Sequence, residues 1–320
     1  MDMVYEVDNE IKQEYLSSKP TATAESDSFI LRTIDEYEQL VNKPVYNLTI
    51  SELDELFSKF GNTSKSSGDK NKSILVTYID FCINKNLVLH KENRARFIDI
   101  KKHVSKQALL NKFISKEKLK DYQKLLYNEQ DQLLLELLFL GVRGRTVGDE
   151  TLEEIINLSI DDVDFDNNII KLRKNNNDDI RTIKVETSTV GLIKDTFEQE
   201  IYVENNGEIT NNPRIADPRK SKINRFENLI FRIPGKNKFE KFHSALFNSR
   251  MTRIKKWVDN PYLTATTVYE SGMIQMAMDI YREKGEVTKD DYIDICDRFD
   301  YGYPFKLKEK FVQYEELLLK

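Results

Sequence analysis

The chain has 320 residues, of which 32% are charged and 39% hydrophobic, and its formal net charge is −5. This length is enough for two domains that each bury a core. No apolar run approaches a membrane span, and the polar, acidic opening does not resemble a secretory signal. The distant cysteines, Cys82 and Cys296, favour a reduced, cytoplasmic protein. With no zinc-type Cys/His spacing and no phosphate-binding glycine loop, we predict no metal, no cofactor and no membrane partner.

The charges are distributed unevenly along the chain. Residues 1–28 contain seven acids and two bases. By contrast, residues 63–112 contain eleven bases and four acids, and residues 214–256 contain thirteen bases and three acids. Two separate basic blocks are typical of a protein that holds nucleic acid between two lobes. Two solvated lysine-rich surfaces would produce the same pattern.

The N-terminal third is expected to be helical after an acidic, weakly structured arm at residues 1–27. Apolar spacing predicts a first helix at residues 28–41. Thr49 is a candidate N-cap for the second helix, because a glutamate stands three residues later as in a capping box. Helices at residues 70–84 and 91–101 are predicted to follow a Ser/Lys/Gly loop.

Residues 133–185 contain the most informative order of elements. The apolar run 133–140 predicts two turns of buried helix that end at Gly141, just before Arg143. An amphipathic segment at 152–158 and a turn-rich acidic cluster come next. Two alternating segments around a polar tip then predict a β-hairpin, with strands at 169–173 and 180–185 and the tip at 174–179.

This order of elements resembles the catalytic domain of tyrosine recombinases, the phage integrases. The short helices ahead of it resemble the core-binding domain of that family. The resemblance implies a mainly α fold with a small β-hairpin or sheet, in a two-domain tyrosine-recombinase-like architecture. Its implied parts are an acidic flexible arm, a helical SAM-like core-binding domain, a linker and a catalytic-like domain, at residues 1–27, 28–103, 104–114 and 115–320.

Tyrosine recombinases cleave DNA with a tyrosine nucleophile inside a cage of cations. The cage is needed because the phosphorane gathers negative charge and the leaving oxygen needs a proton. The resemblance assigns Arg143 to the first arginine of this cage, and Glu154 to a glutamate that follows it in the family. It assigns the hairpin lysine to Lys174, with Lys171 as the alternative.

The second half of the cage is absent from the sequence. Where the family has His-x-x-Arg, this chain has Thr266 and Tyr269, and none of its three histidines lies beyond residue 243. Tyrosines remain downstream, at Tyr301, Tyr303 and Tyr314. We therefore predict a recombinase fold without strand cleavage, and so a protein that is not an enzyme. An active integrase that attacks through one of the last two tyrosines is the rival hypothesis.

Residues 239–257 predict an amphipathic helix with a polar, basic outer face. Its expected inner residues are Phe242, Leu246, Met251, Ile254 and Trp257. Its expected outer residues are Lys241, His243, Ser244, Asn248, Arg250, Arg253 and Lys255. Side chains that can read bases, interleaved with cations, suit a major-groove helix, and the resemblance also places this segment in the groove. A basic solvated helix would show the same pattern.

The resemblance implies further DNA contacts outside this helix. They lie at the start of the third helix, in the hairpin, and at the strand end before the groove helix: Ser66, Ser67, Lys70 and Lys72; Arg181; Arg232 and Lys236. Hydroxyls and ammonium groups are suited to phosphate contacts. Serines at a helix start are also common as simple caps.

A recombinase scaffold that binds DNA without cutting it suits a transcription regulator. The sequence resembles the recombinase-like lysogeny repressors of SPβ-type Bacillus phages. This resemblance implies double-stranded DNA with operator repeats as the partner, and a cytoplasmic, nucleoid-associated location. Self-association through the C-terminal helix at 305–320, closure of its own core by that helix, and release by a protein or peptide antagonist all stay open. Two competing hypotheses are a non-catalytic partner of a separate recombinase and a protein that binds RNA or protein.

Overall fold

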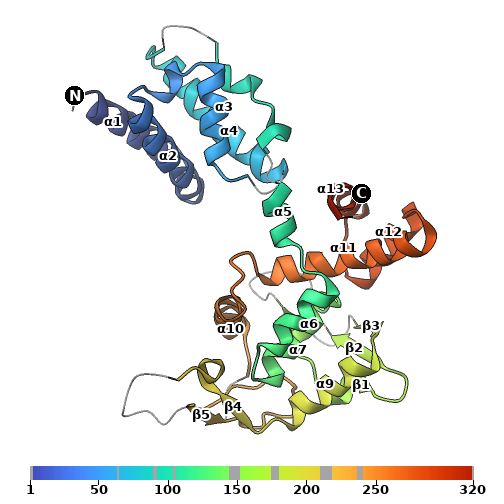
Figure 1. The fold of residues 1–320 in the computed structure, drawn as a ribbon. Coiled ribbons are helices and arrows are strands. Elements are labelled where there is room, and N and C mark those ends of the chain that lie inside the picture. The colour runs from blue at the N-terminus through green and yellow to red at the C-terminus, as the bar shows by residue number, and fades with distance from the viewer. Residues whose placement is uncertain are drawn as a thin grey trace. The chain divides into compact units, whose positions relative to one another are not determined.

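The computed structural model describes residues 3–62, 65–88, 92–103, 106–143, 152–173, 180–209, 218–235 and 241–318, with the backbone alone for residues 3–9. The chain divides into two compact units, Met1–Leu109 and Leu110–Lys320 (Figure 1). The division falls inside the stretch expected to link two domains, where the structure has a helix, α5 (Lys106–Lys112). Within the described ranges no helix is long and apolar enough to cross a membrane.

The first unit is built from helices. Its elements are α1 (Met3–Ser17), α2 (Thr21–Val41), α3 (Ile50–Lys59) and α4 (Lys65–Asn84), with 3-10 turns at Val45–Asn47, Arg94–Phe97 and Ile100–His103. One apolar cluster joins α2, α3 and α4, and its fully buried members include Ile34, Tyr37, Leu56, Phe57, Leu75 and Tyr78. The unit therefore has a core of its own.

The expected weakly structured arm at residues 1–27 is wrong where the structure describes it, because α1 and the start of α2 are helical. Tyr15 is buried, and its hydroxyl donates to Asp27 Oδ2 at 3.0 Å. The buried Lys12 ammonium is paired with two acids of α2, Asp35 and Glu38. These contacts offset the acidic charge that had suggested disorder.

The remaining helices of this unit follow the sequence pattern with shifted boundaries. The capping box at Thr49 is confirmed: the Thr49 hydroxyl accepts from the Glu52 N–H, and the Glu52 carboxylate accepts from the Thr49 N–H. The third helix begins at Lys65, earlier than predicted. The predicted helix at 91–101 is wrong in type, since the described part of this stretch forms 3-10 turns.

The second unit combines helices with two small sheets. Its helices are α6 (Lys116–Lys124), α7 (Glu129–Phe139), α8 (Glu153–Ile156), α9 (Thr187–Glu198), α10 (Ser244–Trp257), α11 (Ala265–Lys284), α12 (Lys289–Arg298) and α13 (Pro304–Leu318). The apolar run predicted as a buried helix forms α7, in which five leucines are fully buried: Leu133, Leu134, Leu135, Leu137 and Leu138. This helix is the centre of the unit.

The predicted hairpin is confirmed as the last two strands of a three-stranded antiparallel sheet. Its strands, in the order β1-β2-β3, are Val163–Asp164, Ile169–Arg173 and Ile180–Lys184. The register pairs Ile170 with Ile183, and both side chains are buried. A second sheet pairs β4 (Ile201–Val203) with β5 (Lys220–Lys222). The hairpin tip lies outside the described residues.

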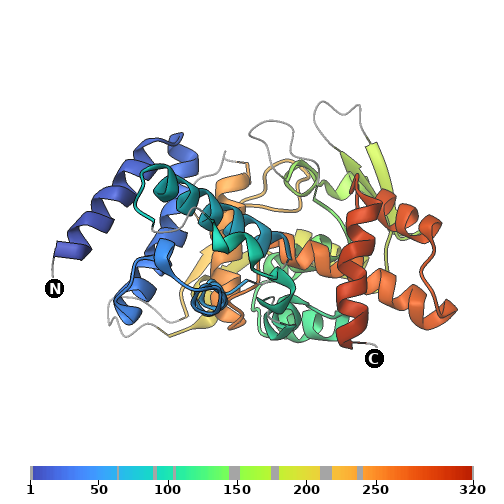
Figure 2. The same ribbon diagram turned by 90° about the horizontal axis from the view of Figure 1, so that it is seen from above.

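The last three helices pack on one another, and α11 crosses α7 (Figure 2). The predicted amphipathic C-terminal segment forms α13, and Leu307 and Phe311 close the core of its own chain. Gly272 lies where α11 crosses α7: a Cβ there would stand 1.9 Å from the Phe139 carbonyl oxygen. Only glycine permits this approach, which brings the first turns of α11 beside the loop that follows α7.

Candidate nucleic-acid interface

A buried carboxylate organises the loop that carries Arg143. Glu154, on α8, has a fully buried side chain, and its Oε2 accepts from the Arg143 backbone N–H at 3.0 Å. The same carboxylate forms a two-pronged ion pair with Arg181 of β3, with both N–O distances at 2.6 Å. Arg181 also donates to the Gly141 carbonyl at 2.7 Å and to the Arg298 carbonyl.

Arg181 is therefore a structural residue, and its prediction as a DNA contact is wrong. Four hydrogen bonds occupy its guanidinium, which has five N–H groups. They tie β3 to the loop after α7 and to the end of α12. A guanidinium that holds three segments of its own chain together has little capacity left for a phosphate.

The turn that presents Arg143 depends on glycine. Gly141 has a φ of +92°, and a Cβ at this position would stand 2.8 Å from the Phe299 ring. Residues that have a Cβ rarely adopt this backbone conformation, and a glycine in it commonly ends a helix. The apolar helix ends here, as predicted. The Val142 N–H then donates back to the Leu137 carbonyl at 2.8 Å, which directs the chain to Arg143.

The guanidinium of Arg143 lies over the ring of Tyr269, with 5.3 Å between its central carbon and the ring centroid. The sequence resemblance predicts that Tyr269 takes the place of the second arginine of the family box. Its hydroxyl donates to the Phe299 carbonyl, and its ring meets the Phe299 ring edge-on at 5.3 Å. Burial raises the pKa of this tyrosine well above its usual value, so the phenol stays neutral.

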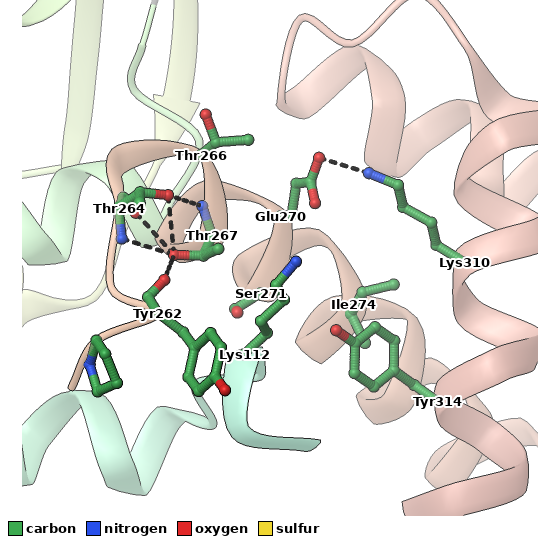
Figure 3. A pocket seen from close by; sticks show the side chains of 11 residues that line it. Lys112, Tyr262, Thr264, Thr266, Thr267, Glu270, Ser271, Ile274, Lys310 and Tyr314 are labelled. Atoms are coloured by element: carbon green, nitrogen blue, oxygen red, sulfur yellow. Dashed lines mark hydrogen bonds and ion pairs between the residues drawn. The ribbon is translucent and has the colours of Figure 1, made fainter. Parts of the chain in front are cut away.

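Thr266, which the resemblance predicts in the place of the family histidine, lines a separate cavity. It contributes to a cavity of about 380 Å³ at the start of α11, together with Lys112, Thr264, Thr267, Glu270, Lys310 and Tyr314 (Figure 3). Thr264 and Thr267 cap the helix, and Glu270 is paired with Lys310. Burial, assisted by Glu270, raises the pKa of Tyr314 to about 12.

The predicted inner stripe of this segment is largely confirmed: Phe242, just before α10, and Met251 and Ile254 on it are buried. Phe247, Arg250, Met251 and Ile254 point inward, whereas the predicted inner residues Leu246 and Trp257 are only half-buried. Arg250, expected on the outer face, is 3% exposed. Its Nε lies 3.4 Å from the fully buried carboxylate of Asp131, and its guanidinium lies over the rings of Tyr202 and Phe242.

The exposed face of α10 is small and polar. Its exposed residues are Ala245, Asn248, Ser249, Thr252 and Lys256, spaced as one stripe of a helix. Of the predicted contacts, Asn248 is in this stripe and His243, the N-cap, is exposed beside it; Ser244 and Arg253 are half-buried. Lys241 is exposed and donates to Asn157 Oδ1.

Ser249, Thr252 and Lys256 were missed by the sequence prediction. The sequence does contain a pattern that places them on the exposed face. Phe247, Arg250, Met251 and Ile254 have the i, i+3, i+4, i+7 spacing of a buried stripe, which leaves the opposite face to solvent. The charge of Arg250 concealed that pattern. Arg298, which no sequence pattern singled out, supplies a carbonyl to Arg181 and donates to the Lys184 carbonyl at 3.0 Å.

The remaining predicted contacts divide into structural and exposed residues. Arg232 is 2% exposed and donates to the last carbonyls around the end of α9, those of Thr196, Phe197 and Gln199, so its prediction as a DNA contact is wrong. Lys72 is half-buried and donates to the Ile98 carbonyl at 2.8 Å. Both side chains stabilise their own unit.

At the start of α4, Ser66 and Lys70 are exposed and Ser67 is half-buried. The first two are therefore accessible to a ligand, as the prediction requires. Lys174 and Lys236 lie outside the described residues. Among the residues that the structure describes, no cluster of three or more His, Cys, Asp or Glu side chains could hold a metal ion.

A helical unit precedes a unit in which a helix, an arginine-bearing turn and a hairpin follow in order, and this defines a two-domain, tyrosine-recombinase-like protein. The profile described as "MrpR, C-terminal catalytic domain" matches residues 113–318, and the one described as "MrpR, N-terminal core-binding domain" matches residues 5–85. The chain therefore belongs to the MrpR family.

Individual proteins with a related sequence or fold share at most about a quarter of their residues with this chain in the examples that follow. The SPbeta prophage-derived protein YopR of Bacillus subtilis (strain 168) is 24% identical over 296 residues, which cover 91% of this chain and 88% of that protein. XerA recombinase is 14% identical with a TM-score of 0.43, covering 97% of this chain and 96% of its own. The Tn1549 transposon integrase in complex with a circular intermediate DNA is 11% identical with a TM-score of 0.47, covering 94% of each chain.

Proposed function

We propose that this protein is a sequence-specific, double-stranded DNA-binding transcriptional repressor that maintains phage lysogeny and does not cleave DNA strands. The observation that carries the proposal is the ring of Tyr269 against the guanidinium of Arg143, where the recombinase box has a second arginine. An aromatic ring cannot neutralise the charge of a phosphorane. The site therefore keeps Arg143 as a cation that can bind a phosphate, and it lacks the second arginine that strand cleavage needs.

The remaining tyrosines support the same proposal. A nucleophilic tyrosine needs a lowered pKa or a base beside it. The pKa of Tyr314 is instead raised to about 12 by burial and by the charge of Glu270, a carboxylate that is already paired with Lys310. Tyr314 lines the same cavity as Thr266 and Lys310. Tyr303 is exposed and stacked edge-on against Tyr301, 5.7 Å between centroids, with the Lys306 ammonium over its ring.

The exposed stripe of α10 supports sequence-specific binding. Asn248, Ser249 and Thr252 can donate and accept hydrogen bonds at base edges, and Ala245 is small enough for a close approach to a thymine methyl group. The buried Arg250–Asp131 pair fixes the helix to α7, so this face is held rigidly. A helix of this kind suits the major groove.

The test is selection of source-genome fragments on the purified protein at a fixed salt concentration, followed by sequencing. We expect many short related sites upstream of genes, and no covalent protein–DNA adduct after incubation with those sites under denaturing electrophoresis. A single pair of inverted repeats around a spacer would instead indicate an accessory recombination protein. An adduct lost in Tyr314→Phe or Tyr303→Phe would identify an active integrase, and no enrichment would contradict DNA recognition altogether.

The groove assignment makes a separate prediction about Asn248. Asn248→Ala should weaken binding to selected sites by about 1–3 kcal/mol, roughly the value of one good base contact, and leave random DNA unaffected. Ser188→Ala, an exposed serine on α9, is the matched control. Competition binding measures the ratio of the affinity for selected sites to the affinity for random DNA in each variant. An equal loss on specific and random DNA would show that α10 does not read bases.

A further inference from the structure

Arg143 differs from its neighbour Arg181 in how its guanidinium is used. Its backbone N–H donates to the Glu154 carboxylate at 3.0 Å, and the central carbon of its guanidinium lies over the Tyr269 ring, 5.3 Å from the ring centroid. No described residue accepts a hydrogen bond from this guanidinium, whereas Arg181 donates four. Within the described part of the chain, the Arg181 guanidinium is therefore bonded to its own chain, whereas the N–H groups of the Arg143 guanidinium stay available to a ligand.

The ring beneath Arg143 is itself immobile. Tyr269 is 5% exposed, its hydroxyl donates to the Phe299 carbonyl, and its ring meets Phe299 at an interplanar angle of 75°. Phe299 is 1% exposed and fits against Gly141, where no Cβ would be accommodated. The same packing therefore fixes both the ring and the turn that carries Arg143.

A guanidinium over an aromatic ring is attracted by the ring's π electrons, and this contact needs no hydrogen-bond acceptor. The forked N–H groups of a guanidinium match the oxygens of one phosphate in a bidentate fashion. Because the ring is neutral and buried, it adds no negative charge that would compete with the phosphate for the guanidinium. An acidic residue in the same position would compete.

We propose that Tyr269 is a positioning residue that orients Arg143 toward one DNA backbone phosphate. The site of Arg143 then binds a phosphate without cleaving the strand. This inference rests on the proposed DNA-binding function. It assigns a role to the residue that replaced the second arginine: the ring contributes by orienting Arg143, and not by touching the DNA.

The test is the salt dependence of DNA binding by the full chain. Binding through one phosphate contributes about 0.9 to the slope of log Kd against log salt concentration, or about 3.5-fold in Kd between 50 and 200 mM. We expect Arg143→Ala, Tyr269→Leu and Tyr269→Met each to lose this part of the slope. Tyr269→Phe, which keeps the ring, should retain it.

Two comparisons separate positioning from a general loss of stability. Tyr281→Leu removes a partly buried tyrosine from the same helix and should leave the slope unchanged. The double variant Arg143→Ala/Tyr269→Met should bind like Arg143→Ala alone, because the ring acts only through the arginine. Additive losses in the double variant would overturn the proposal.

The outcomes also separate this inference from the proposed function. If the wild-type protein binds DNA and Arg143→Ala lowers the slope while Tyr269→Leu and Tyr269→Met do not, the positioning role is excluded and the repressor proposal stands. The same holds if Arg143→Ala leaves the slope unchanged. If the wild-type protein does not bind DNA at any salt concentration, both proposals fall.

Discussion

Replacing Glu154 with alanine should lower the free energy of unfolding of the second unit by about 3–5 kcal/mol, the usual cost of removing one partner of a buried ion pair. The Glu154 side chain is fully buried and its carboxylate accepts from the Arg181 guanidinium and the Arg143 N–H. Without it, the acceptors of the Arg181 guanidinium among the described residues are the Gly141 and Arg298 carbonyls. A buried, uncompensated cation is costly because it has lost its water.

The fluorescence of Trp257 is the appropriate measurement, since it is the single tryptophan of the chain and lies on α10 of this unit. A unit of this size should lose about 2–4 °C of Tm for each kcal/mol. Asp121→Ala, which removes the exposed Asp121–Lys124 pair, is the control and should change stability by less than about 0.5 kcal/mol.

The double variant Glu154→Ala/Arg181→Ala makes the Glu154 prediction sharper. Because it removes the orphaned charge together with its partner, it should be more stable than the sum of the two single losses implies. If Glu154→Ala alone costs less than about 1 kcal/mol, then the ion pair does not hold the turn of Arg143 in place.

The second large effect is expected from Gly272→Ala. The new Cβ would stand 1.9 Å from the Phe139 carbonyl oxygen and 3.1 Å from the Phe299 ring, so α11 must move away from α7. Forcing a methyl group into a close-packed contact costs about 1–3 kcal/mol and occasionally more. We expect a loss of unfolding free energy near the upper end of this range, because the Phe139 carbonyl is part of the backbone and cannot rotate aside.

Gly191→Ala is the matched control, since Gly191 also lies in a helix, α9, and nothing stands within 4 Å of its added Cβ. It should stabilise the protein by about 0.5–1 kcal/mol, as alanine does in an open helical position. The Trp257 fluorescence reports both variants. Equal stability changes in the two would mean that the crossing of α11 and α7 is not close-packed.

Gly272→Ala also has a functional consequence. Tyr269 stands one turn before Gly272 on α11, and Arg143 follows α7 directly. A wider separation of the two helices should therefore move the ring away from the guanidinium. The salt slope of DNA binding should fall in Gly272→Ala and stay unchanged in Gly191→Ala.

Local patterns in the sequence were sufficient for elements whose partners are near in the chain. The capping box at Thr49, the buried run of α7, its end at Gly141 and the hairpin of β2 and β3 each depend on residues a few positions apart. Such features follow from the helical and strand periods and from backbone conformation alone. They were predicted correctly for that reason.

Charge misled the prediction wherever a cation was buried. Arg181, Arg232 and Arg250 were all predicted at a DNA surface, and each is packed inside the second unit. Their internal partners are Glu154, the carbonyls at the end of α9, and Asp131, which lie 27 or more residues away in the chain. A composition count cannot distinguish a cation with a distant internal partner from a solvated one.

The sequence by itself determined the family resemblance, the order of elements and the absence of the His-x-x-Arg box, because these depend on residue identity and local spacing. Only the tertiary structure decided which arginine is turned inward and which is held over a ring. The helix crossing at Gly272 and the network of Glu154 bring Tyr269 to Arg143 and turn Arg181 inward. These contacts join residues far apart in the chain, and they form only when α7, α11 and the hairpin pack together.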